Sequence, residues 1–325
     1  RDNDEYQATL RLPPPGRYDH AIRVSVDGGF SYTYADGQPA GSSDGYQIEN
    51  AGDLFVGDQA ARVAREGQVV ISEILYDPNG IPDNLGEWIE LFNPTDRDLD
   101  LTTCFLEDAT REQAPLDGVI VPAFGYAVVA RSLDPAVNGG IQAAATFPFT
   151  LDDDGDVVSL VCRFEVDRVD YDVGLEFPAA TGTSIQVDVA HQSLRENDQG
   201  GYWCEGAAGG TPGGANRDCG PLEGFSAERM QAIFDVHCDG CHTHGAVTEG
   251  LSLDGFEAQT FNVPSTQLPA MPLITPGDRR QSYLYYKLSG EHFQLPGGQG
   301  VWMPPAVPFP PTTIERFGLF IDGLQ

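Results

Sequence analysis

Short runs of alternating apolar and polar residues recur through residues 68–220, with turn-forming residues between them. Alternation with a period of two is typical of β-strands, and loops rich in Asp, Gly and Pro predict the turns that join them. No stretch in this range shows sustained helical periodicity, so we expect an all-β sandwich. The runs are QVVISEILYD, GEWIELFNP, LDLTTCFLED, GYAVVARS, DVVSLVC and TSIQVDV.

Three further strand-like runs precede this segment, namely YQATLRL, HAIRVSVDGG and FSYTYADG. A complete immunoglobulin-like sandwich needs about seven strands. Residues 1–66 are therefore predicted to form a partial immunoglobulin-like β module with a connector. An incomplete sheet leaves edges that can pair with another chain, which makes self-assembly through β edges an open alternative.

The pattern changes at residue 221 to helices joined by long loops rich in Pro and Gly. FSAERMQAIFDVHC places Met230 and Phe234 at helical spacing, with Ser226 as a candidate N-cap. DRRQSYLYYKLSG predicts a second helix, and PTTIERFGLFIDGL predicts a third with Thr312 and Glu315 as a capping box. A domain with so few helices, joined by such loops, needs another component in its core. The expected domains are residues 1–66, 67–220 and 221–325.

The chain is strongly acidic, with a net charge of −31 over 325 residues, and most of the acidic residues lie between residues 67 and 220. Such a surface disfavours nucleic acid and anionic membranes as partners. No run of 18 apolar residues is present, so no membrane span is expected. The first residue is an arginine, which is more typical of a mature or trimmed chain.

The motif CDGCH at residues 238–242 fits C-x-x-C-H, the signature of covalent haem c attachment. In this spacing the thiols of Cys238 and Cys241 each form a thioether with the porphyrin. His242 then lies under the ring as the proximal iron ligand. The four other cysteines are even in number and can form two disulfides, which suits an oxidising compartment outside the cytoplasm.

Two other chemistries fit a pair of cysteines at this spacing. Structural zinc needs four ligands, and His237, His244 and His292 are the histidines that could complete a set with the two thiols. A redox-active dithiol needs a βαβ context, which the sequence does not offer.

The distal iron ligand is expected to be Met303 in GVWMPPAVP, because a Met before Pro-Pro is held in extended chain. Met271, His244 and His292 are weaker alternatives, and Met230 fits the core face of its helix. Methionine–histidine ligation raises the reduction potential and leaves no open position on the iron.

VVISEILYDPNG…GEWIELFNPTDRDLDL resembles the opening of the lamin tail domain, an immunoglobulin-like β-sandwich whose bacterial versions occur on secreted multidomain proteins. WCEGAAGGTPGGANRDC is similar to the closing segment of these domains. The resemblance covers about 150 residues and implies a disulfide between Cys204 and Cys219. The remaining pair, Cys104 and Cys162, would then join two strands. The resemblance to the lamin tail domain also implies an accessory module without catalytic residues.

Residues 221–325 resemble small bacterial cytochrome c domains, through CDGCH, VPSTQLPAMPLITPGDRRQSYLYYKLSG, VWMPP and the final helix. In that family a loop Met is the distal ligand, so the resemblance implies thioethers from Cys238 and Cys241, with His242 and Met303 on the iron. Cations near the haem propionates could be Arg279, Arg280 or Lys287.

These features predict a multidomain extracytoplasmic protein, found in the periplasm, at the cell surface or secreted. It carries one haem c, transfers single electrons to or from redox partner proteins, and uses its β-sandwich modules for docking or spacing. The first hypothesis is therefore an electron carrier rather than an enzyme. The second hypothesis is a structural or adhesive surface or filament protein with the haem domain as one module. The third is an enzyme in which an open haem has peroxidase-like activity.

Calcium is a further candidate ligand, because Asp-rich turns can supply oxygen ligands. Two groups are candidates, one in LDDDGDVVSL and one in the loop before EWIEL. The spacing in the first group does not match an EF-hand loop, and a solvated turn is the alternative. The two groups consist of Asp152, Asp153, Asp154 and Asp156, and of Asp77, Asn79, Asp83 and Glu87.

Overall fold

The computed structural model describes residues 64–172, 175–305 and 307–325, and of the first 63 residues only the backbone of four short strands. The chain divides into two compact units, residues 1–63 and 64–325. In the first unit, short antiparallel pairs join β1 to β4 and β2 to β3. The predicted partial immunoglobulin-like module otherwise lies outside the described residues. The four strands are β1 (Gly16–Tyr18), β2 (Arg23–Val24), β3 (Thr33–Tyr34) and β4 (Leu54–Val56).

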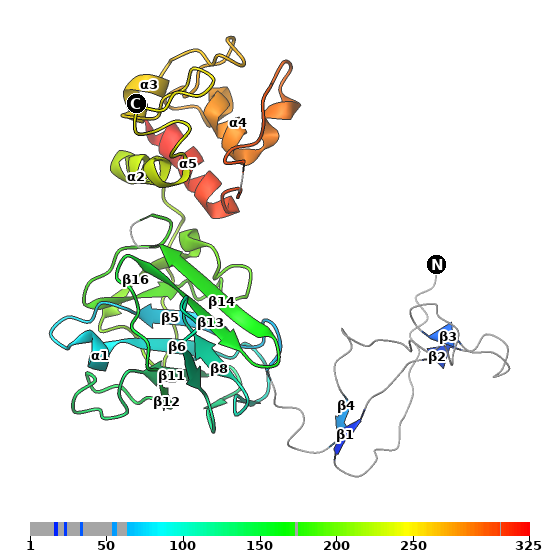
Figure 1. The fold of residues 1–325 in the computed structure, drawn as a ribbon, viewed down its shortest axis with the longest axis vertical. Coiled ribbons are helices and arrows are strands. Elements are labelled where there is room, and N and C mark those ends of the chain that lie inside the picture. Colours follow the sequence, from blue (N-terminus) through cyan, green and yellow to red (C-terminus); the bar gives the residue numbers. More distant parts are fainter. Residues whose placement is uncertain are drawn as a thin grey trace. The chain divides into compact units, whose positions relative to one another are not determined.

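Two sheets form the sandwich of the second unit (Figure 1). The larger sheet consists, in spatial order, of β12 (Ala145–Thr146), β11 (Tyr126–Ala130), β6 (Trp88–Phe92), β5 (Val70–Leu75), β15 (Thr183–Val187) and β16 (Trp203–Ala208). The smaller sheet consists of β14 (Glu165–Asp172), β13 (Gly155–Val161), β8 (Phe105–Glu107) and β9 (Gln113–Pro115). A short pair joins β7 (Leu99–Asp100) to β10 (Ile120–Val121), and a single helical turn, α1 (Asp83–Gly86), precedes β6.

One hydrophobic core takes side chains from both sheets, so they are two layers of one sandwich. Ile71 and Ile89 come from the larger sheet, and Leu106, Leu160 and Val169 come from the smaller one. The expected all-β, immunoglobulin-like sandwich is thus confirmed, and each of the six runs predicted as strands contains a strand. The two sheets enclose this core because period-two alternation places every second side chain of a strand on one face.

Both disulfides have the expected partners. Cys104 is bonded to Cys162, which joins the chain before β8 to the end of β13, and Cys204 in β16 is bonded to Cys219. The second bond closes the loop that follows β16. That loop covers Glu73 and Glu90 on the outer face of the larger sheet, where Thr211 donates to Glu73 and the Gly213 N–H donates to Glu90 at 2.7 Å.

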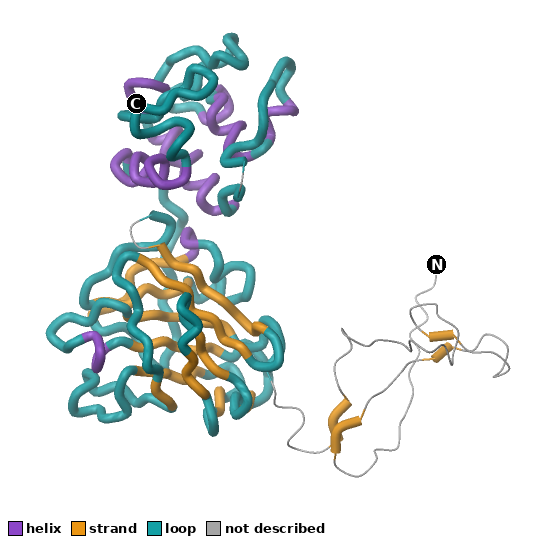
Figure 2. The backbone as a smooth tube through the Cα atoms, in the orientation of Figure 1, coloured by secondary structure: helices purple, strands orange, loops and turns teal. Residues whose placement is uncertain are grey.

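Helices and long loops form the rest of the second unit (Figure 2). α2 begins after Ser226, whose Oγ accepts the Arg229 N–H at 3.2 Å, as its role as N-cap predicts. The predicted capping box is wrong, because α5 begins at Pro311 and no side chain caps it. The helices are α2 (Ala227–His237), α3 (Phe256–Thr260), α4 (Tyr283–Ser289) and α5 (Pro311–Gly323), with short 3₁₀ turns η1 (Gly200–Tyr202), η2 (Arg279–Gln281) and η3 (Glu291–Gln294).

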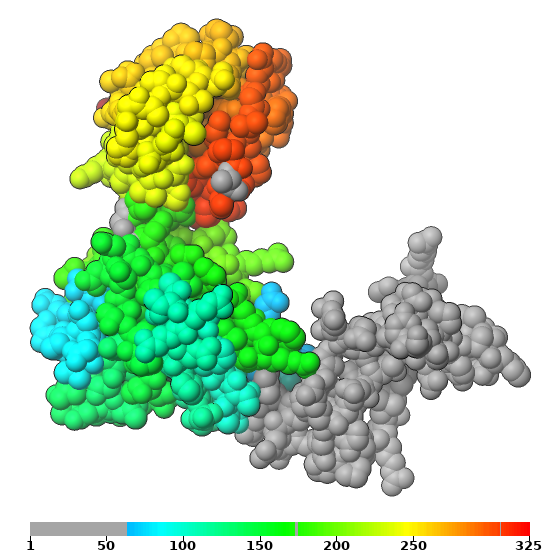
Figure 3. Space-filling view, in the orientation of Figure 1, coloured from blue at the N-terminus to red at the C-terminus, as the bar shows by residue number. Residues whose placement is uncertain are grey.

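Aromatic side chains hold these helices together. Phe234 of α2 contacts Phe256 of α3 and Phe317 of α5, with ring centroids 5.2 and 6.1 Å apart. Phe320 of α5 also reaches Phe256. Figure 3 shows the segments concerned, coloured yellow-green to red, packed against each other. In the part of the chain that the structure describes, none of the helices has the length and apolar character needed to cross a membrane.

Candidate functional site

The CDGC turn directly follows α2, which fixes the direction in which its residues project. Cys238 caps the helix, and its N–H donates to the Phe234 carbonyl at 2.9 Å. Gly240 takes a positive φ of 73°, which favours glycine and lets the chain reverse. The His242 N–H then donates to the Cys238 carbonyl at 3.0 Å. The turn therefore holds Cys238, Cys241 and His242 close together at the end of a rigid helix.

The His242 imidazole has one ring nitrogen engaged and the other free. The side chain is buried, with 7% of its surface exposed, and Nδ1 lies 3.1 Å from the Leu251 carbonyl. A carbonyl oxygen only accepts, so Nδ1 carries the proton and donates. In the neutral ring Nε2 is then the acceptor, and it makes no hydrogen bond within the described residues. This is the tautomer that a metal-ligating imidazole needs.

One cavity contains both predicted axial ligands. His242 lines it from the turn after α2, and Met303, 61 residues later in the sequence, lines it from the loop before α5. Much of the remaining wall is apolar and comes from Leu251, Leu273 and Leu284. The fold therefore brings the two side chains to the walls of one largely apolar space, although they lie far apart in the sequence.

The loop that carries Met303 is tied to α4 and η3. The Met303 N–H donates to the Lys287 carbonyl at 3.0 Å, and the Trp302 indole N–H donates to the Leu288 carbonyl at 2.8 Å. His292 is fully buried, and its Nε2 lies 3.0 Å from the Gly300 carbonyl, to which it donates. These bonds fix the backbone on which Met303 is presented.

Both cysteines of the motif are unpaired, although their spacing would allow a disulfide. Burial, with smaller contributions from the neighbouring Cys241 and Asp235, raises the pKa of the Cys238 thiol to about 12. A thiol that stays protonated is a poor redox nucleophile. Structural zinc needs four ligands, and no group of three or more His, Cys, Asp or Glu side chains in the described residues is arranged to hold a metal ion. Neither cysteine lines the cavity itself, but both lie in the turn that carries His242. Two unpaired thiols in that turn, together with the imidazole and the thioether on the cavity wall, fit a covalently attached haem.

The other candidate iron ligands lie elsewhere. Met230 is in the helical core, as its spacing predicts, and Met271 does not line the cavity. His244 is exposed and pairs with Asp239 at 2.9 Å. His292 does not line the cavity and instead holds the Met303 loop.

Metal clusters of other kinds find no support in residues 64–172, 175–305 and 307–325, where no group of three or more His, Cys, Asp or Glu side chains is arranged to hold an ion. In the Asp-rich turn, Asp152 accepts the Asp154 N–H at 2.9 Å and Asp156 accepts the Val157 N–H at 2.7 Å. These carboxylates serve the turn itself. The calcium hypothesis remains a prediction without structural support.

Of the three cations considered for the haem propionates, only Lys287 lines the cavity. Arg279 forms ion pairs with Glu315 at 2.8 Å and Asp322 at 2.7 Å. Arg280 is exposed on η2. Lys287 is therefore the cation that the fold presents to the same space as His242 and Met303.

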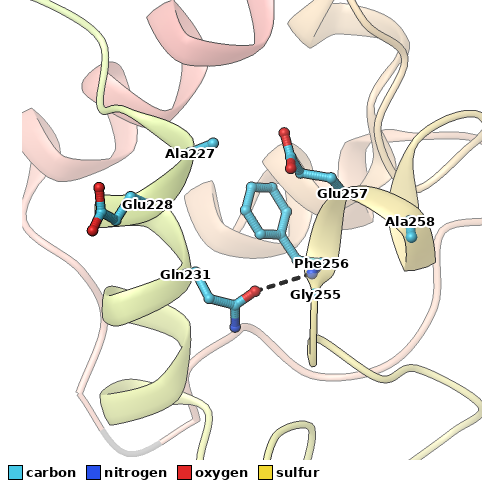
Figure 4. Close-up of a pocket in the computed structure, with 7 residues that line it drawn as sticks. All are labelled: Ala227, Glu228, Gln231, Gly255, Phe256, Glu257 and Ala258. Atoms are coloured by element: carbon cyan, nitrogen blue, oxygen red, sulfur yellow. Dashed lines mark hydrogen bonds between the residues drawn. The ribbon is translucent and has the colours of Figure 1, made fainter.

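A second hollow lies between the start of α2 and α3 (Figure 4). Gln231 spans it, accepting the Phe256 N–H at 3.1 Å and donating to the Leu253 carbonyl at 2.9 Å. Its other polar lining consists of Glu228 and Glu257. The hollow contains no nucleophile, histidine or cation, so it gives no indication of a reactive site.

Two residues at the cavity carry no signal in the sequence. Leu251 acts through its backbone carbonyl, which any residue type could supply. Gln267 lines the cavity with its side chain, but an isolated Gln in a loop marks no chemistry. Both positions become visible only once the chain has folded.

Comparison with known families matches residues 62–172 to the Lamin Tail Domain. The match ends at β14, while β15 and β16 continue the larger sheet beyond it. No curated protein and no solved structure matches the chain, so the cytochrome c resemblance of residues 221–325 stays a prediction. The opening of the lamin tail resemblance lies within residues 62–172 and is confirmed, whereas its closing segment, residues 203–219, lies beyond the match and stays a prediction.

Proposed function

We propose that residues 221–325 hold one haem c and that the protein transfers single electrons outside the cytoplasm. Cys238 and Cys241 would form the thioethers, and His242 and Met303 would ligate the iron. The supporting observation is that His242 and Met303, 61 residues apart, line one cavity. Two disulfides are compatible with an oxidising location.

The residues around the cavity have distinct roles in this proposal. A haem bound here supplies one-electron transfer, and the protein positions and tunes it. The Leu251 carbonyl orients the His242 ring and makes its free nitrogen more basic. Met303 offers a soft thioether that favours the reduced iron. Leu251, Leu273 and Leu284 exclude water.

Substitution of Met303 tests the ligand assignment directly. In the proposed arrangement, Met303→Leu would remove the sulfur ligand and leave the iron open to small molecules. We expect the weak band at the red end of the oxidised spectrum to disappear, the reduction potential to fall, and carbon monoxide to bind the reduced protein. Cells that mature c-type cytochromes should supply the protein, and a pyridine haemochrome assay should show thioether attachment.

The chain offers a matched control, because it contains only three methionines. Met271→Leu makes the same change outside the cavity and should leave the spectrum unchanged. A wild-type protein that matures without covalent haem would refute the proposal. A Met303→Leu variant that keeps the red band would refute Met303 as the ligand.

A further inference from the structure

Lys287 is a buried cation on the wall of the proposed haem cavity. It is the only lysine in the chain, lies on α4, and exposes 5% of its surface. Its Nζ donates to the carbonyl of Gln299 at 3.3 Å and to that of Val301. The ammonium therefore belongs to the same space as His242 and Met303.

No carboxylate within the described part of the chain forms an ion pair with the Lys287 ammonium. The one acidic residue in the cavity lining, Glu249, is exposed. Lysines are almost never fully buried without a partner, since removing the charge from water costs several kcal/mol. Burial accordingly lowers the pKa of Lys287. The site thus contains a positive charge with neutral carbonyl partners and no anion.

A second donor lies beside this ammonium. A Cβ atom placed on Gly300 would lie 2.7 Å from both Nε2 and Oε1 of Gln267 and 2.8 Å from Lys287 Nζ. The ends of both side chains therefore pack against the same glycine backbone, within one small region of the cavity wall. The Gln267 side-chain amide makes no hydrogen bond to another described residue. One charged and one neutral donor close together on the cavity wall can bind a carboxylate that enters the cavity.

We propose that Lys287 Nζ and the Gln267 side-chain amide bind one propionate carboxylate of the haem. The proposal rests on the proposed function, because the propionate arrives with the haem. The haem brings two carboxylates, and one of them supplies the anion that the Lys287 site lacks. Arg279 is already paired with two carboxylates, and Arg280 is outside the cavity.

Lys287→Met tests this assignment through the pH dependence of the reduction potential. Without the ammonium, the propionate loses its partner and its pKa rises. Above that pKa the unpaired carboxylate favours ferric iron, so at pH 8 the equilibrium constant for reduction should be lower than in the wild type, about tenfold for one charge near 10 Å at partial burial. At pH 5 a proton replaces the lost charge, so the difference should shrink.

Arg280→Met removes an equal charge from the exposed 3₁₀ turn η2 and should keep the wild-type profile. Gln267→Leu retains the ammonium and removes only the neutral donor, so it should shift the propionate bending band in resonance Raman spectra while leaving the fold and Met303 ligation intact. This second variant decides the question if Lys287→Met does not mature. An unshifted band in Gln267→Leu would then overturn the assignment.

Haem content separates failure of this assignment from failure of the proposed function. If the wild type contains no covalent haem, both fall together. If the variants carry haem with the red sulfur band, and Lys287→Met follows the wild-type potential from pH 5 to pH 8, only the propionate assignment is overturned.

Discussion

At the scale of single residues, two buried glutamates lie side by side on neighbouring strands of the sandwich, and their burial affects their protonation. Glu73 of β5 and Glu90 of β6 are partners in the sheet register, and both are fully buried. Ser72 donates to Glu90 at 2.9 Å, and the Gly213 N–H donates to it at 2.7 Å. Burial, and then the charge of Glu73, raises the pKa of Glu90 to about 8. Folding therefore favours its protonated form.

This raised pKa predicts that the sandwich loses stability as the pH rises. Glu90 stays protonated in the folded chain up to about pH 8, whereas the unfolded chain releases the proton near 4.5. The folded state binds more protons between these values, so stability is present at low pH and falls with a slope of up to about 1.4 kcal/mol per pH unit. Glu90→Gln removes the titration and should make the slope shallower, as measured by urea unfolding at pH 5, 6.5 and 8.

Other buried acids act in the same direction, so the slope of the Glu90→Gln variant should be reduced rather than abolished. The pKa of Glu87 is raised to about 8 and that of Glu176 to about 7, both chiefly by burial. Glu66→Gln, at an exposed position, should keep the wild-type slope. Equal slopes in Glu90→Gln and the wild type would contradict the prediction.

At the scale of structural elements, the two disulfides restrain very different lengths of chain. Cys104–Cys162 closes a separation of 58 residues across the smaller sheet, while Cys204–Cys219 closes 15 residues around the loop over Glu73 and Glu90. A crosslink stabilises mainly by removing freedom from the unfolded chain, and the effect grows with the closed length. The longer crosslink is therefore expected to contribute more to stability.

Removing each bond by paired Cys→Ala substitutions tests this order. We expect a loss of about 4 kcal/mol for the Cys104–Cys162 pair and about 3 kcal/mol for the Cys204–Cys219 pair, measured by denaturant unfolding of the mature protein. Full reduction of the wild type should lower stability by at least the larger amount. The reverse order, with the shorter loop costing more, would show that local packing outweighs chain entropy.

The same scale explains how much of the fold could be predicted from the sequence. Four strands could be predicted because the side chains on their buried face are mostly apolar, which gives the sequence its period-two pattern. They are β5, β6, β11 and β15. β14 was not predicted, because Asp167 interrupts its pattern and is buried by accepting the Ile71 N–H at 2.6 Å. That partner lies 96 residues away, and no local pattern reports it.

Part of the candidate site could likewise be predicted from the sequence, and part could not. Cys238, Cys241 and His242 follow from spacing within one turn, and Met303 follows from its Pro-Pro context. Lys287 and Gln267 both pack against Gly300, which lies on a third segment. Such tertiary juxtapositions carry no periodicity. The sequence therefore offers three candidate cations for the proposed propionate contact, and of these only Lys287 lines the cavity.

At the scale of the whole described unit, two arginines join the helices to the sandwich. Arg229 of α2 donates to the carbonyls of Leu175 and Phe177, which lie between β14 and β15. Arg316 of α5 donates to the Glu176 carbonyl at 3.2 Å and stacks on Phe225, 4.0 Å from the ring centroid. Because α2 also leads directly into the CDGC turn, these bonds couple the proposed haem site to the sandwich.

This coupling predicts that the helices and the sandwich unfold together. In the double variant Arg229→Met/Arg316→Met, the carbonyls of the sandwich segment lose charged donors, at about 1–3 kcal/mol for each group left unpaired. We expect one thermal transition in the wild type and two in the variant. Haem absorbance follows the helices, and far-ultraviolet circular dichroism follows the strands. Arg195→Met changes an exposed arginine of the sandwich and should keep the single transition. Coincident transitions in the double variant would mean that apolar contacts, such as those of Phe225, couple the two parts without the arginines.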